Sequence, residues 1–190
     1  MEQESAQPDT KPRPGRSPWR RTIIIITSVL IACALLFFVA PFLLAVFVAQ
    51  PVKVEGAAMS PTLNDGDRVF VSKDVAELRR GDIVVFHYPQ DTTKSFVKRI
   101  VGLPGETIKI DREGKLYING VLTNEPYVAP ERNQGPRTVP EQTIKADHYY
   151  VLGDNRDASN DSRTFGAVSK DLIYGKVVMR YWPLGKPLKG

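Results

Sequence analysis

The run Thr22–Val52 constrains this chain most, because it carries no charged residue over about 31 positions. An apolar helix of about 20 residues crosses the hydrocarbon core of a bilayer, so the run is long enough for one crossing and too short for two. Pro41 lies inside the run, and membrane helices tolerate a proline kink. We therefore predict a single transmembrane helix at residues 22–50.

A cleaved signal peptide is the alternative interpretation of this run. The apolar region of such a peptide spans only about 7–15 residues. Phe47 would also stand at position −3 if Ala49 were at −1, which fits the small-residue rule poorly. Arg20 and Arg21 precede the run, so the helix is predicted to be an uncleaved anchor with a cytoplasmic N-terminus. The polar, proline-rich tail at 1–21 is predicted to be disordered.

Composition excludes several classes of function. The net charge is +5, with no dense basic patch, so nucleic acid is not an expected partner. The single cysteine, Cys33, allows no internal disulfide and no thiolate–zinc cluster. With only His87 and His148 as imidazole ligands, we expect no metal site and no cofactor.

Residues 51–190 are predicted to form one mostly β domain, because short alternating segments separated by turn residues dominate it. Thr107–Ile110 and Leu116–Ile118 are expected to pair as a hairpin, followed by a turn at Asn119–Gly120. Ser169–Tyr174 is the one expected helical turn, and Glu125–Gln142, with four prolines, is expected to be a long surface loop. The remaining expected strands are Arg68–Ser72, Asp82–His87, His148–Leu152 and Lys176–Tyr181.

Lys98 is a candidate catalytic residue, because it interrupts the apolar segment formed by Phe96, Val97, Ile100 and Val101. The simpler interpretation is a lysine on the solvent face of a strand. If the amine is instead partly buried, desolvation lowers its pKa, and the neutral amine can take a proton from a hydroxyl.

Two other stretches are candidates to face this lysine. The segment from Gly153 to Arg163 is dense in Asp, Asn, Ser and Arg directly after a strand. It is interpreted either as a solvated turn or as a rigid loop that orients a catalytic group. The segment Gly56–Leu63 is interpreted either as a strand exit or as a turn of the kind that bears a nucleophile.

Four motifs together resemble the type I signal peptidases, or leader peptidases, and the resemblance covers about Val52–Tyr181. The motifs stand in the family's order and spacing. They are Met59-x-Pro61-Thr62-Leu63, Arg80-Gly81-Asp82-Ile83-Val84, Lys98-Arg99-Ile100-x-Gly102-x-Pro104-Gly105 and Gly153-Asp154-Asn155-Arg156-x-x-Ser159-x-Asp161-Ser162-Arg163.

The resemblance implies a mostly β catalytic domain of signal peptidase fold behind one membrane anchor. It implies a serine endopeptidase of the bacterial plasma membrane that removes signal peptides from exported preproteins after Ala-x-Ala-like sites. Its expected partners are therefore signal peptides and the lipid bilayer.

Matched motif by motif, the resemblance gives roles to individual residues. Lys98 resembles the general base, and Ser159 the hydroxyl that orients it. Val54, Phe96 and Val97 match the shallow substrate pockets, and the backbone of residue 58 matches the oxyanion hole. Gly56, also on the substrate side, stands where some members carry a second oxyanion donor. Arg99, Asp154, Asp161 and Arg163 match the structural ion pairs.

The chain departs from the family at the nucleophile, because Ala58 stands where the family has serine. Ser60 is no substitute, since two residues of extended chain span about 6.5–7 Å and proton transfer needs about 2.6–3.2 Å. Ala58 is either a deliberate serine-to-alanine change or a mark of a natural pseudoenzyme. The presence of Lys98 and Ser159 favours the first.

Two alternative functions stay open. One is a non-catalytic protein that binds signal peptides or regulates a true peptidase. The other is a specialised relative that acts on one dedicated substrate, such as a pilin. Repressors of the LexA type share the Ser–Lys pair but carry a DNA-binding module where this chain has an apolar run, so they are set aside.

Overall fold

The computed structural model describes residues 18–135, 137–184 and 188, so most of the predicted tail at 1–21 lies outside the described residues. Two compact units divide the chain, Met1–Ala45 and Val46–Gly190.

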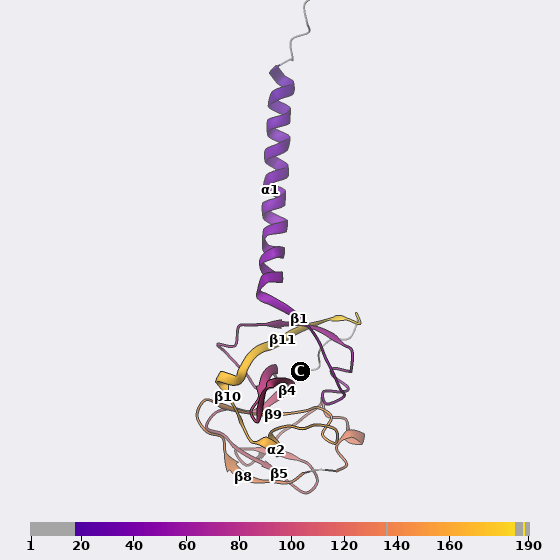
Figure 1. The fold of residues 1–190 in the computed structure, drawn as a ribbon, viewed down its shortest axis with the longest axis vertical. Helices are drawn as coiled ribbons and strands as arrows, with labels where there is room; N and C mark the ends of the chain where they lie inside the picture. The colour runs from indigo at the N-terminus through magenta and orange to yellow at the C-terminus, as the bar shows by residue number, and fades with distance from the viewer. Residues whose placement is uncertain (1–17, 136, 185–187, 189–190) are drawn as a thin grey trace, which may run out of the picture. The chain divides into compact units, whose positions relative to one another are not determined.

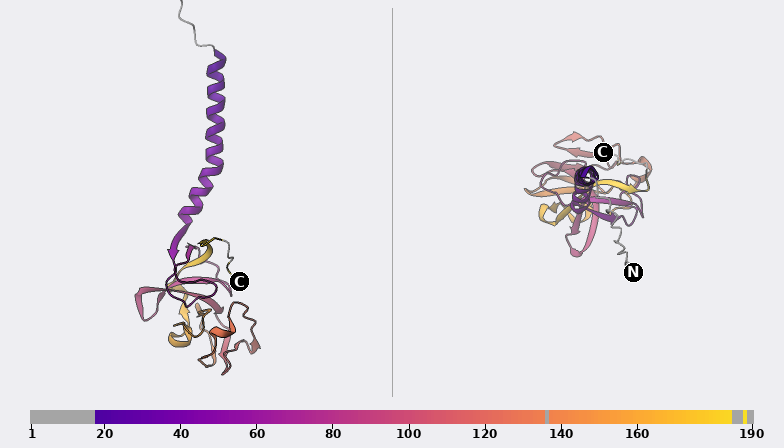
Figure 2. Two further views of the ribbon diagram at one scale, coloured as in Figure 1. Left: turned by 90° about the vertical axis from the view of Figure 1, so that its right-hand side faces the viewer. Right: turned by 90° about the horizontal axis from the view of Figure 1, so that it is seen from above.

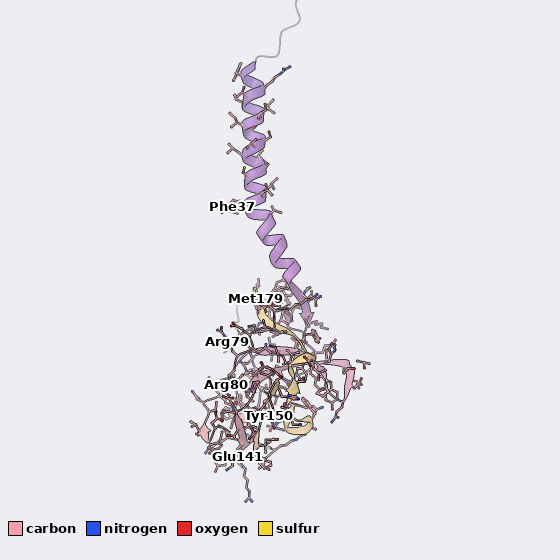
Figure 3. The ribbon with its side chains drawn as sticks, turned by 90° about the vertical axis from the view of Figure 1, so that its left-hand side faces the viewer. Phe37, Arg79, Arg80, Glu141, Tyr150 and Met179 are labelled. Carbon is pink, nitrogen blue, oxygen red and sulfur yellow. The ribbon has the colours of Figure 1, made fainter. Side chains whose placement is uncertain are left out.

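One long helix, α1 (Pro18–Val48), dominates the first unit (Figure 1). Its most apolar stretch, Arg21–Val39, has a mean hydropathy of 2.9, which is apolar enough to cross a membrane. Large side chains such as Leu36 and Phe37 are 70% or more exposed, as expected of residues that face lipid. The helix bends just beyond Phe37 (Figure 3). Pro41 lacks the N–H that would bond to the Phe37 carbonyl, which accounts for the bend.

The helix differs in its limits from the predicted span at 22–50. It begins at Pro18, and Ala49–Lys53 leaves the helix to form strand β1. In this strand Val52 pairs with Val69 of β2 (Arg68–Ser72). Hydropathy did not reveal this boundary, because the strand continues the uncharged run.

The second unit is mostly β, as predicted. Its larger sheet has the strand order β1-β2-β11-β3-β4-β9-β10, and the smaller sheet has the order β7-β6-β5-β8. The smaller sheet lies at the end of this unit away from β1 (Figure 1). The further elements are β3 (Ile83–Tyr88), β4 (Asp91–Gly102), β5 (Thr107–Ile110), β6 (Leu116–Ile118), β7 (Val121–Leu122), η1 (Pro130–Arg132), β8 (Val139–Thr143), β9 (His148–Leu152), α2 (Ser162–Phe165), β10 (Val168–Ser169), η2 (Lys170–Leu172) and β11 (Ile173–Trp182).

The predicted hairpin and the turn after it are confirmed. Ile108 of β5 pairs with Ile118 of β6. The next turn places Asn119 at φ 51° and Gly120 at φ 77°. A two-residue turn with both φ values positive matches the twist of the strands that it joins, and Asn-Gly adopts this conformation readily.

The prediction of a continuous loop at Glu125–Gln142 is wrong at its end, because β8 pairs with β5 through Thr143 and Gln142. Pro140 obscured this strand in the sequence. A proline is tolerated here since β8 is the outermost strand of its sheet.

The β3–β4 hairpin determines where an open strand edge lies, and its outer half projects from the unit (Figure 2, left). Strand β4 pairs with β3 from Asp91 to Arg99, whereas β9 pairs with it only from Arg99 onward. Among the strands that the structure describes, none pairs with the other side of Asp91–Lys98. That side of β4 is therefore open to an added strand, although the Val97 carbonyl accepts a hydrogen bond from the Lys98 Nζ.

Candidate functional site

The predicted site residues meet at a cavity of about 340 Å³ in the second unit. One wall is the chain that leaves β1, and the other is formed by β3, β4 and β11. Core residues form its floor, since Val54, Met59 and Val85 belong to the same buried cluster. Six residues singled out in the sequence line the cavity, namely Val54, Gly56, Ala58, Phe96, Val97 and Lys98.

Lys98 lies at the open edge of β4, and only 5% of it is exposed. Its Nζ donates to the Val97 carbonyl at 3.0 Å and lies 5.0 Å from the centre of the Phe96 ring. Burial lowers the pKa of this amine to about 8, against a smaller opposing effect of the Asp161 charge. About a tenth of the lysine is then neutral at pH 7, which is enough for it to act as a base.

The loop after β9 is held rigidly behind the cavity. The carboxylate of Asp161 accepts a hydrogen bond from the Gly153 N–H at 3.1 Å and pairs with Arg163 at 2.8 Å. Asp161 also caps the short helix α2 by accepting from the Arg163 N–H. These contacts fix the loop from both sides of Ser159.

Ser159 lies against the turn that carries Ala58. A Cβ added to Gly153 would lie 2.2 Å from the Ser159 Oγ and 2.6 Å from the Ala58 carbonyl oxygen, so only glycine fits between them. The Ser159 Oγ is buried and has no hydrogen-bond partner within the described residues. Its role in orienting Lys98 therefore stays a prediction from the sequence.

Asn155 contributes a second link that the sequence analysis did not assign. Its backbone N–H donates to the Ala58 carbonyl at 3.0 Å, and its side-chain Nδ2 donates to the Ala57 carbonyl at 3.2 Å. Both bonds join segments almost one hundred positions apart in sequence. They fix the backbone of residues 57 and 58 against the loop.

A buried bidentate ion pair also fixes the loop after β9. The guanidinium of Arg99 donates to both carboxylate oxygens of Asp154, at 2.9 and 2.8 Å. The two side chains are 1% and 0% exposed. Arg99 also donates to the Gly81 carbonyl at 2.9 Å and lies 4.1 Å above the Tyr127 ring. The pair thus connects β4, the loop after β9 and the turn before β3.

The sequence analysis gave no substrate-binding role to the residues that lie along the rest of the cavity. Tyr174 and Ser95 carry no chemistry that marks them in a sequence, and the registers of β11 with β3 and of β4 with β3 were needed to place them. The further lining residues are Val52, Lys53, Glu55, Met59, Val85 and Asn160. Within the described ranges, no group of three or more His, Cys, Asp or Glu side chains is arranged to hold a metal ion.

Comparison with known proteins identifies the family. Residues 22–182 match the family described as signal peptidase, peptidase S26. The chain belongs to this signal peptidase family. It is 36% identical over 167 residues to the signal peptidase IB of Staphylococcus aureus strain COL, covering 78% of this chain and 86% of that protein. It is 39% identical over 149 residues to a probable signal peptidase I-2 of Synechocystis sp., covering 73% of this chain and 65% of the relative.

The chain is also similar to a solved signal peptidase I from Enterococcus faecalis V583. The two chains are 34% identical, with a TM-score of 0.46, and the match covers 54% of this chain and 97% of the other.

Proposed function

We propose that this chain is a membrane-anchored member of a family that acts on the signal peptides of preproteins, built to cleave exported preproteins after small residues at −3 and −1. The proposed chemistry is that of a Ser–Lys dyad that lacks its serine here. The observation that carries the proposal is the buried Lys98 amine, which lines the same cavity as Ala58. With alanine at 58, the chain binds signal peptides without turning them over.

The open edge of β4 supports peptide binding by strand addition. A peptide lying along Asp91–Lys98 would gain main-chain hydrogen bonds from the unpaired edge, and its alternate side chains would enter the cavity. Val54, Val85 and Val97 offer a shallow apolar surface there, continuous with the core. Such a surface fits side chains as small as alanine.

Lys98 would act as the general base for a hydroxyl at position 58. It would take the serine proton as the oxygen attacks the carbonyl of the scissile bond, and the backbone N–H of residue 58 would face the developing oxyanion. The lysine would then return the proton to the leaving amine.

Ser60 offers no route around Ala58. The residue is 5% exposed, and its hydroxyl donates to the side-chain oxygen of Asn64 at 2.8 Å. Ser60 is also not among the residues that line the cavity. This geometry supports an inactive chain rather than a relocated nucleophile.

The charges beside α1 support a membrane topology. We place the N-terminus in the cytoplasm and the second unit outside, because Arg20 and Arg21 precede the apolar helix. In this arrangement the candidate site meets preproteins on the far side of the bacterial plasma membrane.

A non-catalytic role is the second candidate, and Ala58 itself favours it. A binding measurement tests what the two candidates share. The full chain in detergent should bind a fluorescent signal peptide with alanine at −3 and −1, and should bind a peptide with tryptophan at both positions at least about tenfold more weakly. Equal affinity for both peptides would contradict the proposed groove.

The pH dependence tests the role of Lys98. In the Ala58→Ser form, the cleavage rate should rise with pH and level off above a midpoint near the Lys98 pKa of about 8. Below that midpoint the amine is protonated, so the rate should fall about tenfold for each pH unit. Peptide affinity measured over the same range is the control. A rate that does not change through the midpoint would remove Lys98 from the role of base.

A further inference from the structure

Tyr174 stands at the end of the cavity away from Ala58, and a bulge places it there. In the pairing of β11 with β3, Ile173 lies opposite Phe86 and Gly175 lies opposite Val85, so Tyr174 is the extra residue. A bulge redirects a side chain at a sheet surface. The ring is 36% exposed and lines the cavity.

His87 supports the Tyr174 ring from behind. The two ring centres are 4.6 Å apart, with 35° between the ring planes. The His87 Nδ1 is buried and has no hydrogen-bond partner in the described part of the chain. The imidazole therefore serves here as a flat packing surface that holds the phenol ring in place.

The register of the sheet gives the position of this platform along the groove. His87 lies opposite Ser95, and Val85 lies opposite Val97, so these four residues share one face of the β3–β4 pair. Ser95 is two residues further than Val97 from Lys98, a displacement of about 6.6 Å along the strand. Tyr174 is stacked on His87 and therefore belongs to the Ser95 end.

An extended substrate can lie along only one part of this edge. Strand β9 occupies the edge of β4 from Arg99 onward, so a bound peptide extends from Lys98 toward Ser95. Its side chains alternate, and those at −1, −3 and −5 face the same way. If the −3 side chain lies at Val97, the −1 residue lies past the end of the open edge, toward Ala58, and the −5 side chain lies at Ser95 and Tyr174.

We infer that Tyr174 and His87 form an aromatic subsite for the −5 residue of the substrate, and that this subsite prefers a large apolar or aromatic side chain. Resting on the proposed peptide-binding function, the inference adds a second determinant of specificity beyond the small-residue pockets. Val52, on the opposite wall of the cavity, adds apolar surface.

The test is the affinity of the full chain in detergent for fluorescent signal peptides that keep alanine at −1 and −3. The residue at −5, and in parallel that at −4, is varied among alanine, leucine, phenylalanine and lysine. Phenylalanine or leucine at −5 should bind about 3- to 10-fold more tightly than alanine. Changes at −4 should have little effect.

Variants then assign the preference to the ring pair. Tyr174→Ala and His87→Ala should abolish the preference at −5, so that the peptides with phenylalanine, leucine and alanine at this position bind with similar affinity. Tyr174→Phe and His87→Phe should retain it. Tyr181→Ala is the matched control, since Tyr181 lies on the same strand, packs on Phe70 with ring centres 4.5 Å apart and lies outside the cavity.

The outcomes distinguish failure of the −5 subsite from failure of the whole peptide-binding groove. A preference that is absent, that survives Tyr174→Ala or that appears at −4 overturns the subsite while the groove stands. If no peptide binds, the proposed function and the subsite are both overturned.

Discussion

Replacing Ala58 with serine should switch on cleavage of a preprotein that carries an Ala-x-Ala site, by at least about 10⁴-fold over the chain with alanine. The restored hydroxyl would join a cavity that already holds a buried amine with a pKa of about 8 and a backbone fixed by Asn155. A hydroxyl added at position 58 should therefore meet an amine that can already act as its base, and the preprotein should be cleaved. Cleavage of a labelled preprotein in detergent, by both forms side by side, measures the effect.

The control is Lys98→Ala in the serine form, which should abolish turnover and leave peptide affinity nearly intact. If neither form cuts but both bind the preprotein, the non-catalytic function is correct. If the chain with Ala58 already cuts, the nucleophile lies elsewhere, and Ser60→Ala is the next variant to measure. Cleavage of one preprotein but not of generic Ala-x-Ala substrates would select the specialised relative.

Asp154→Ala should destabilise the second unit by about 3–5 kcal/mol, because it leaves the Arg99 guanidinium buried without its carboxylate. Both side chains of this pair are almost completely inaccessible. The loss should also displace the loop that carries Asn155 and Ser159. Urea-induced unfolding of the full chain in detergent, followed by tryptophan fluorescence, gives the free energy of unfolding.

Glu77→Ala provides the matched control, because it removes the carboxylate of an ion pair with Arg79 at the surface. That pair is also short, at 3.0 Å, but its side chains are 77% and 80% exposed. Such a pair contributes about 0–1 kcal/mol. Similar losses of unfolding free energy for the two variants would mean that the other contacts of the Arg99 guanidinium, such as that with the Gly81 carbonyl, are enough to stabilise it without Asp154.

Much of the fold could be predicted because its signals are local. Alternation and turn residues identified β2, β3, β5, β6, β9 and β11, and Asn119–Gly120 has the positive φ values that its sequence favours. The uncharged run gave the helix. Its end was misjudged, because hydropathy does not distinguish the last helical turns from Ala49–Lys53, which depends on pairing with β2.

The site was predictable in a different way. Spacing within the motifs singled out Lys98, Ala58 and the loop after β9, and the structure brings the first two to one cavity. The roles of Asn155 and Tyr174 depend on contacts between segments distant in sequence. A backbone bond to residue 58 or a ring exposed by a bulge leaves no local pattern, so neither could be inferred before the strands were in register.

The unpaired side of Asp91–Lys98 also makes the protein prone to aggregate in solution. If preproteins bind at this strand edge as proposed, the edge must remain open, and it is then equally open to a second folded or partly folded chain. Edge-to-edge pairing of this kind is a common route to aggregation. Charged Asp91 and Lys94 stand at the outer end of this edge, joined at 2.8 Å. Charges at a sheet edge discourage such pairing. Asp91 and Lys94 therefore protect the end of the edge furthest from Lys98, and the segment nearest the cavity is where aggregation by strand pairing would begin.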